Sequence, residues 1–321
     1  MTKLLLSTIN FFIFLSTTFA QIDIKKDSNY IEAPVVLETK TGNIYGTLTT
    51  PIQTKSSPLV IIIAGSGPTD RDGNTIMIKG KNNSLKYLAN ELGNAGISSI
   101  RFDKRGIGES KLAMKSEADL RFDDYVNDVI DWINKFKKDN RFSEIIIAGH
   151  SEGSLIGMIA ANGLADKYIS ISGAGEKAGT LIKKQLLTQS EEIQDYSNQA
   201  IDSLEAGFMV KKINPLLYSL FRPSVQPYLI SWFKYDPQTE IKKLKIPVLI
   251  LQGDNDIQVS VEDAQMLYKA QPEANLTIVT NMNHVLKIVE GDKSKNIKSY
   301  SDASLPIADE LVRVIVGFLG K

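Results

Sequence analysis

The sequence feature that most constrains this chain is a serine that lies between an apolar run and a helical pattern. Residues 145–148 are apolar, Gly149-His150-Ser151-Glu152-Gly153 follows at once, and apolar side chains then recur at helical spacing over residues 155–159. A strand, a sharp turn and a helix with a serine at the apex make a nucleophile elbow, whose glycines avoid collisions with neighbouring backbone. The pattern predicts that Ser151 projects from the end of a sheet, above the N–H groups of a helix start.

The composition excludes several other chemistries. The 321 residues contain no cysteine and only two histidines, His150 and His284. Disulfides, thiol catalysis and cysteine-based metal sites are therefore excluded, and a catalytic zinc site would need both histidines. The formal net charge is zero, so no nucleic-acid partner is expected. We expect no cofactor and no metal.

The first twenty residues have the pattern of a secretory signal peptide. Lys3 supplies a positive charge, residues 4–15 form a short apolar core, and Thr18-Phe19-Ala20 is a small-residue cleavage site. The alternative is an uncleaved membrane anchor, although the apolar run is short for a bilayer. We expect export to the periplasm or the medium, with no stable membrane insertion after cleavage.

Beyond this segment, apolar runs alternate with helical patterns. Strands are predicted at residues 34–37, 44–49, 59–63, 97–102, 145–148, 168–172, 247–251 and 276–279, and further helices at 84–92, 122–136, 261–270 and 307–319. Such alternation indicates an α/β fold with a mostly parallel central sheet and helices on both faces. In such sheets the site lies beyond the carboxyl ends of the strands, which is where Ser66, Arg105 and Ser151 fall.

The alternation stops between residues 176 and 245. Apolar side chains recur there at helical spacing until Pro215, and six aromatic residues follow between Tyr218 and Tyr235. We interpret this segment as a helical cap inserted into the sheet domain. The predicted division is signal peptide 1–20, core 21–175, cap 176–245 and core 246–321. The aromatic residues would form the core of the cap or line an acyl pocket.

A serine nucleophile needs a base, and the base needs an acid that fixes its tautomer. His150 is a poor base for Ser151, because adjacent residues at a strand end point in opposite directions. This leaves His284, which follows the last predicted strand. Asp254 and Asp256 both follow a buried strand and could each serve as the acid.

These residues resemble those of the α/β-hydrolase superfamily, in its bacterial serine esterase and serine aminopeptidase-like branch. The matching residues are Gly149-His150-Ser151-Glu152-Gly153, the run from Asp103 to Ser110, and Gly253, Asn255, Asp256 and Val259. The resemblance implies that the acid is Asp256, in Gly-x-x-Asp-x-x-Val. The run from Ser66 to Asp72 further resembles a branch with carboxylesterase activity, in which a segment like Tyr235-Asp236-Pro237 often closes the cap.

The chain departs from the commoner family pattern after the third predicted strand. Many relatives have His-Gly there, whereas this chain has Ala64-Gly65. We predict that the backbone N–H groups of Ser66 and Glu152 form the oxyanion hole, with Gly67 as the alternative to Ser66. We expect Asp103 and Arg105 to be structural.

The predicted function is a serine hydrolase that cleaves small-molecule carboxylic esters of short to medium acyl chains through an acyl-enzyme. Ser151, His284 and Asp256 form the predicted triad. One alternative is a peptidase on the same fold, in which Glu191 or Glu192 of the cap would hold a substrate amine. The other is a binding protein that has lost activity. The sequence does not predict the oligomeric state.

Overall fold

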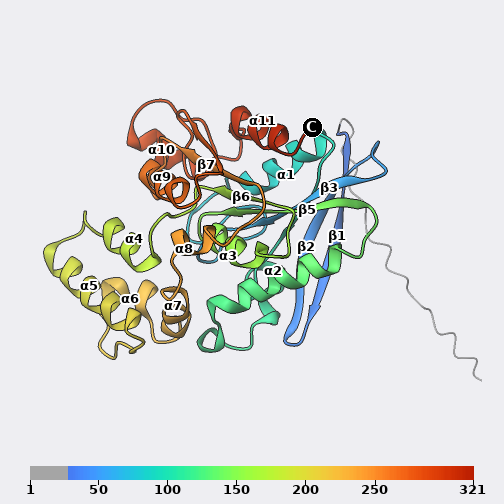
Figure 1. Ribbon diagram of the computed structural model, residues 1–321. Coiled ribbons are helices and arrows are strands. Elements are labelled where there is room, and N and C mark those ends of the chain that lie inside the picture. Colours follow the sequence, from blue (N-terminus) through green and yellow to red (C-terminus); the bar gives the residue numbers. More distant parts are fainter. Residues whose placement is uncertain (1–27) are drawn as a thin grey trace, which may run out of the picture.

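An eight-stranded sheet organises the computed structural model, which describes residues 28–321 (Figure 1). The predicted signal peptide, residues 1–20, lies outside the described residues. The strand order is β1-β2-β4-β3-β5-β6-β7-β8. The strands are β1 (Tyr30–Thr39), β2 (Gly42–Pro51), β3 (Ser57–Ile63), β4 (Ser98–Phe102), β5 (Phe142–His150), β6 (Lys167–Ile171), β7 (Val248–Gly253) and β8 (Asn275–Val279).

The sheet is antiparallel at one edge and parallel over the rest. β1 and β2 form a hairpin, and β2 pairs antiparallel with β4. Every other neighbouring pair, from β4 to β8, is parallel. β3, β4 and β7 are buried along their whole length, as expected for strands covered on both faces. The predicted α/β fold with a mostly parallel sheet is confirmed.

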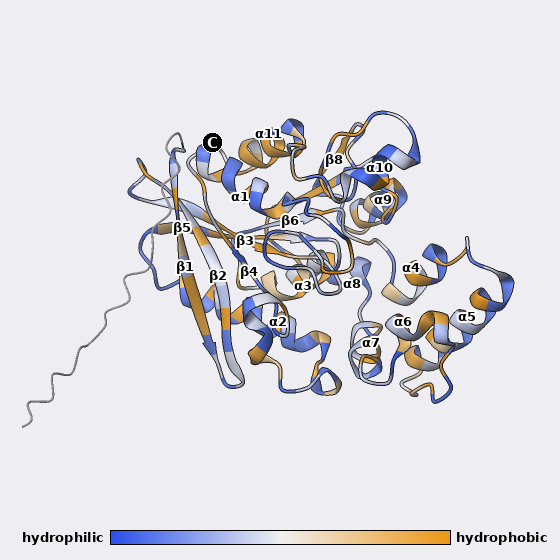
Figure 2. Cartoon of the chain, turned by 180° about the vertical axis from the view of Figure 1, so that it is seen from behind, coloured by the Kyte–Doolittle hydropathy of each residue, from blue (hydrophilic) through white to orange (hydrophobic). Residues whose placement is uncertain are grey.

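Alternation along β3 explains why the sheet has two cores. Leu59, Ile61 and Ile63 face the helices α2 (Phe122–Phe136) and α3 (Glu152–Ala161). Val60 and Ile62 face the helices α1 (Ser84–Asn94) and α11 (Asp309–Phe318), because successive side chains of a strand point to opposite faces. Figure 1 shows these two helix layers on either side of the sheet, and Figure 2 shows hydrophobic residues along the strands between them.

A helical segment separates β6 from β7. It contains α4 (Ala178–Gln185), α5 (Glu191–Glu205), η3 (Pro215–Leu217), α6 (Tyr218–Phe221), α7 (Gln226–Trp232) and α8 (Pro237–Ile241). We call residues 176–245 the inserted segment; its limits stay a prediction. Figure 1 shows α4 to α7 together on one side of the sheet. Several of the aromatic residues form a core with α2, since Tyr228 and Trp232 both contact the ring of Phe122.

The remaining elements are short. They are η1 (Gly108–Ala113), η2 (Glu117–Asp119), α9 (Val261–Ala270) and α10 (Lys293–Ser299). Within residues 28–321, no helix is both long enough and apolar enough to cross a bilayer. The same residues contain no group of three or more histidine, aspartate or glutamate side chains placed to hold a metal ion.

Candidate active site

Ser151 lies at a strained turn between β5 and α3. Its backbone has φ 56° and ψ −122°, a conformation that non-glycine residues rarely adopt and that occurs often at functional sites. A Cβ atom on Gly149 would lie 2.2 Å from the carbonyl oxygen of Gly153, and one on Gly153 would lie 2.4 Å from that of Ile63. Neither position has room for a side chain, because neighbouring backbone passes too close, and both must therefore be glycine. The N–H of Ser151 donates to the carbonyl of Ile171 at 2.9 Å, which ties the apex to β6.

His284 and Asp256 meet at the same edge of the sheet. Asp256 follows β7 and His284 follows β8, and the His284 Nδ1 lies 2.7 Å from the Asp256 Oδ2. Both side chains are buried. The other oxygen, Oδ1, accepts from the backbone N–H groups of Gln258 at 2.8 Å and Val259 at 3.0 Å. The carboxylate is thus held from two sides.

The surroundings of Asp256 determine its charge. Burial alone would raise the pKa of this carboxyl, but the charge and hydrogen bond of His284, together with the two backbone N–H groups, lower it below 3.8. An ionised carboxylate only accepts hydrogen bonds, so the Nδ1 of His284 carries a proton and donates it. In neutral imidazole the Nε2 is then the acceptor, as a general base requires.

Asp254 has a different partner. Its Oδ1 accepts from the backbone N–H of Asn281 at 2.6 Å, so its carboxylate supports the loop that follows β8. The structure brings Asp256, and not Asp254, to the imidazole of His284.

The second histidine supports the loop that carries the first. The His150 Nε2 donates to the backbone carbonyl of His284 at 2.8 Å, and the two ring centroids are 4.8 Å apart. Burial, with a contribution from His284, lowers the pKa of His150 from 6.5 to about 3. His150 is therefore neutral at ordinary pH, and its ring holds the backbone of His284 in place.

The two predicted oxyanion donors lie beside the apex. A Cβ atom on Gly65 would lie 3.1 Å from the Cβ of Ser151, so the peptide that joins Gly65 to Ser66 borders Ser151. The carbonyl of Ser66 accepts from the Thr69 hydroxyl at 2.8 Å. Glu152 is the first residue of α3, and its N–H has no partner within that helix.

A family model and a curated relative both match this chain. A family model for "Serine aminopeptidase, S33" matches residues 79–174. Esterase EstD of Thermotoga maritima is 26% identical over 282 residues, which are 84% of this chain and 65% of that protein. The chain thus spans just under two thirds of the length of this curated relative. This chain has the α/β-hydrolase fold.

Solved structures show the same fold. Est1E of Butyrivibrio proteoclasticus, with ferulic acid bound, superposes with a TM-score of 0.58 at 18% identity over 89% of this chain and 100% of that one. Esterase Pf2001 of Pyrococcus furiosus superposes with a TM-score of 0.59 at 17% identity over 92% of each chain.

The sequence did not predict the roles of two side chains near Ser151, Lys104 and Tyr228. Both bind the carboxylate of Glu152, at 2.8 Å from the Lys104 Nζ and 2.6 Å from the Tyr228 hydroxyl. The Lys104 Nζ also donates to the carbonyl of Gly65 at 2.6 Å. The available signal was a lysine directly after a buried strand, within the motif that runs from Asp103 to Ser110.

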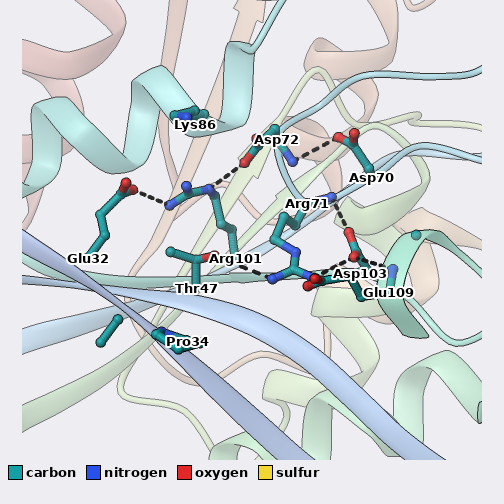
Figure 3. Close-up of a pocket in the computed structure, with 12 residues that line it drawn as sticks. Glu32, Pro34, Thr47, Asp70, Arg71, Asp72, Lys86, Arg101, Asp103 and Glu109 are labelled. Carbon is teal, nitrogen blue, oxygen red and sulfur yellow. Dashed lines mark hydrogen bonds and ion pairs between the residues drawn. The ribbon is translucent and has the colours of Figure 1, made fainter. Parts of the chain in front are cut away.

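A polar cleft of about 600 Å³ is lined by residues of β1, β2, α1, the loop that follows β3 and the end of β4. Figure 3 shows that two arginines pair with carboxylates inside it. The Nη2 of Arg71 lies 2.6 Å from the Oδ2 of Asp103. Arg101 pairs with two carboxylates: its Nε lies 2.8 Å from the Oδ1 of Asp72, and its Nη1 lies 2.9 Å from the Oε1 of Glu32. Both arginines at the centre of the cleft are therefore neutralised by carboxylates of the protein itself.

These contacts anchor the loop that begins at Ser66. The Asp103 Oδ1 accepts from the backbone N–H of Arg71 at 2.8 Å, and the Asp70 Oδ1 accepts from those of Asp72 and Asn74, both at 2.9 Å. Arg105 instead pairs with Asp128 on α2. Asp103 and Arg105 thus both make contacts that anchor loops and helices, and their structural role stays a prediction.

Proposed function

We propose that this α/β-hydrolase cleaves carboxylic esters through a Ser151-His284-Asp256 triad. The observation that carries the proposal is the 2.7 Å contact between His284 Nδ1 and Asp256 Oδ2, at the sheet edge where the strained turn presents Ser151. The esterase named among the relatives supports an ester as the substrate.

The proposed reaction has two halves. The Ser151 hydroxyl attacks the ester carbonyl while its proton passes to the Nε2 of His284, and the oxyanion accepts hydrogen bonds from the N–H groups of Ser66 and Glu152. Collapse of this intermediate expels the alcohol, which takes the proton from His284. Water then attacks the acyl-enzyme by the same route and releases the acid.

The inserted segment supports a limit on acyl length. Its helix α7 reaches the residue next to the nucleophile, because the Tyr228 hydroxyl donates to Glu152. A helix this close to the elbow is placed to limit the space beside Ser151. We therefore propose short to medium acyl chains, recognised by apolar contact.

A peptidase is the second candidate, since the matching family model describes a serine aminopeptidase. The glutamates proposed to hold a substrate amine give it little support. Glu191 and Glu192 are exposed at the start of α5, and α5 lies on the outer side of the inserted segment, away from α3 (Figure 1).

Rates on matched substrates decide between these activities. The wild-type protein should hydrolyse p-nitrophenyl butyrate faster than aminoacyl p-nitroanilides by orders of magnitude, because an ester leaving group demands less acid assistance. Comparable or faster anilide cleavage would assign a peptidase. A fluorophosphonate that fails to label Ser151 would assign a binding protein without activity.

A further inference from the structure

A buried ion pair lies beside the site, because one of its members, Glu152, follows Ser151 directly in the chain. Lys104, two residues after β4, and Glu152 are joined at 2.8 Å, and each side chain is only 2% exposed. The Lys104 ammonium also lies 4.8 Å from the ring centroid of Tyr125. Removing two charges from water costs several kcal/mol for each ion, and such a pair is often no more stabilising than apolar residues of the same volume. Stability alone therefore does not explain the pair, and its other contacts indicate what it does.

The third partner of Lys104 is the carbonyl of Gly65, at 2.6 Å. This carbonyl and the N–H of Ser66 belong to one planar trans peptide, so they point in opposite directions. The ammonium therefore fixes the rotation of the peptide that carries the proposed oxyanion donor. A charge-assisted bond to the carbonyl also polarises the peptide, which strengthens its N–H as a donor.

Glu152 connects this peptide to the second donor. Its backbone N–H is the other proposed oxyanion donor, while its carboxylate holds the ammonium that orients the first. Lys104 occupies one oxygen of that carboxylate and Tyr228 the other, at 2.6 Å. Burial, then the negative charge of Glu152, raises the pKa of Tyr228 well above its usual range, so its hydroxyl keeps its proton and donates.

We propose that Lys104 is a positioning residue of the oxyanion hole, held by Glu152 and coupled through Tyr228 to helix α7 of the inserted segment. Lys104 acts on the Gly65–Ser66 peptide and does not touch the substrate. The inserted segment thereby contributes to catalysis through the position of a backbone N–H as well as by covering the site. This inference rests on the proposed hydrolase function.

The test separates positioning from stability with a single and a double substitution. Lys104→Met should lower kcat on p-nitrophenyl butyrate by about 10²–10³-fold, the loss typical of one oxyanion donor, with KM changed less than threefold. It should also destabilise the protein, because it leaves Glu152 buried without its partner. Lys104→Met/Glu152→Gln removes both charges and should recover most of the unfolding temperature, while kcat stays low because Gly65 still lacks its donor.

Two further variants complete the design. Tyr228→Phe keeps both charges and should lower kcat by about 3–10-fold at nearly constant KM, the effect of one hydrogen bond. The control is Arg105→Met, which breaks a buried pair with Asp128 away from Gly65; it should lower the unfolding temperature and leave kcat within about twofold. Recovery of wild-type kcat in the double variant would overturn the proposal, as would an equal loss of kcat in Arg105→Met.

The rate of fluorophosphonate inactivation gives a readout that does not depend on ester preference. Phosphonylation places an oxygen in the oxyanion hole, so Lys104→Met should slow it by a factor similar to the loss in kcat. If wild-type protein is labelled but cleaves no ester, the ester assignment fails, and the ratio of labelling rates still decides the role of Lys104. If wild-type protein is not labelled, both proposals are wrong.

Discussion

At the scale of single residues, the site depends on how each carboxylate and imidazole is partnered. Asp254 and Asp256 are two residues apart, yet one binds a backbone N–H of Asn281 and the other binds the Nδ1 of His284. Their side chains are chemically identical, so only their hydrogen-bond partners separate the supporting role of Asp254 from the proposed role of Asp256 in orienting His284.

Asp256→Asn should therefore reduce kcat far more than Asp254→Asn. An amide at position 256 can donate to Nδ1 and so favours the wrong imidazole tautomer, a change that costs about 10⁴-fold in serine proteases. Asp254→Asn weakens one hydrogen bond and should lower the free energy of unfolding by about 1 kcal/mol with little change in kcat. Kinetics and urea unfolding of both variants check this, and the reverse ranking would move the acid to Asp254.

The buried imidazole of His150 makes a separate prediction about acid stability. Its pKa is about 3 in the folded protein and near 6.5 when unfolded, so between these values the unfolded chain binds a proton that the folded chain does not. Stability is therefore lost as pH falls below 6.5. This one residue should account for about 2 kcal/mol between pH 7 and pH 5.

His150→Gln removes this titration and keeps a donor for the carbonyl of His284. The difference in unfolding free energy between pH 7 and pH 5 should shrink by that amount in the variant, measured by urea unfolding at both values. An unchanged difference would mean that the pKa of His150 is the same in the folded and the unfolded protein.

At the scale of elements, the elbow is set by backbone contact between β5, α3 and β3. Gly153→Ala should lower the free energy of unfolding by about 3 kcal/mol or more and abolish turnover, because its Cβ would lie 2.4 Å from the carbonyl oxygen of Ile63. Gly317→Ala in α11 is the matched control. No atom lies within 4 Å of its added Cβ, so it should stabilise the protein by about 0.5–1 kcal/mol. Equal effects in thermal unfolding would contradict this account.

The elements that sequence predicted well are those with a continuous or periodic apolar signal. β3 and β7 are apolar on both faces, and α2 was predicted at Phe122–Phe136, where it lies. α10 carries one long aliphatic side chain, Ile297, which is 53% exposed, so it has no such signal. The helical pattern predicted before Pro215 is interrupted between α4 and α5.

The sequence proposes a residue for the candidate site where the end of one predicted strand carries one reactive side chain. Ser151 and His284 follow from the motif and from elimination. The contacts of Lys104 and Tyr228 with Glu152 span 48 and 76 residues, and no local periodicity encodes a contact between segments that far apart. Only the assembled sheet edge shows that these side chains meet.

At the scale of the whole molecule, helix α7 of the inserted segment contacts Glu152, next to Ser151, and we propose that it closes one end of an acyl pocket. Each methylene that finds apolar wall gains about 0.8 kcal/mol, so kcat/KM should rise over the first few acyl carbons and then fall. A series of p-nitrophenyl esters from acetate to palmitate checks this. A rise that continues to palmitate would mean that the inserted segment leaves an open acyl channel.

Export is the other prediction at this scale. Cleavage after Ala20 should leave Gln21 as the first residue of the mature protein. Intact-mass spectrometry of protein recovered from the periplasm or the medium checks it, and a mass that retains residues 1–20 would favour the uncleaved anchor.

The central claim is that Ser151 is the nucleophile of an ester hydrolase, and Ser151→Ala tests it most directly. The variant lacks only a hydroxyl at a turn held by glycines, so its unfolding temperature should match that of the wild type. Its kcat on p-nitrophenyl butyrate should fall by at least about 10⁴-fold. A folded Ser151→Ala protein that keeps more than a trace of esterase activity would contradict the account.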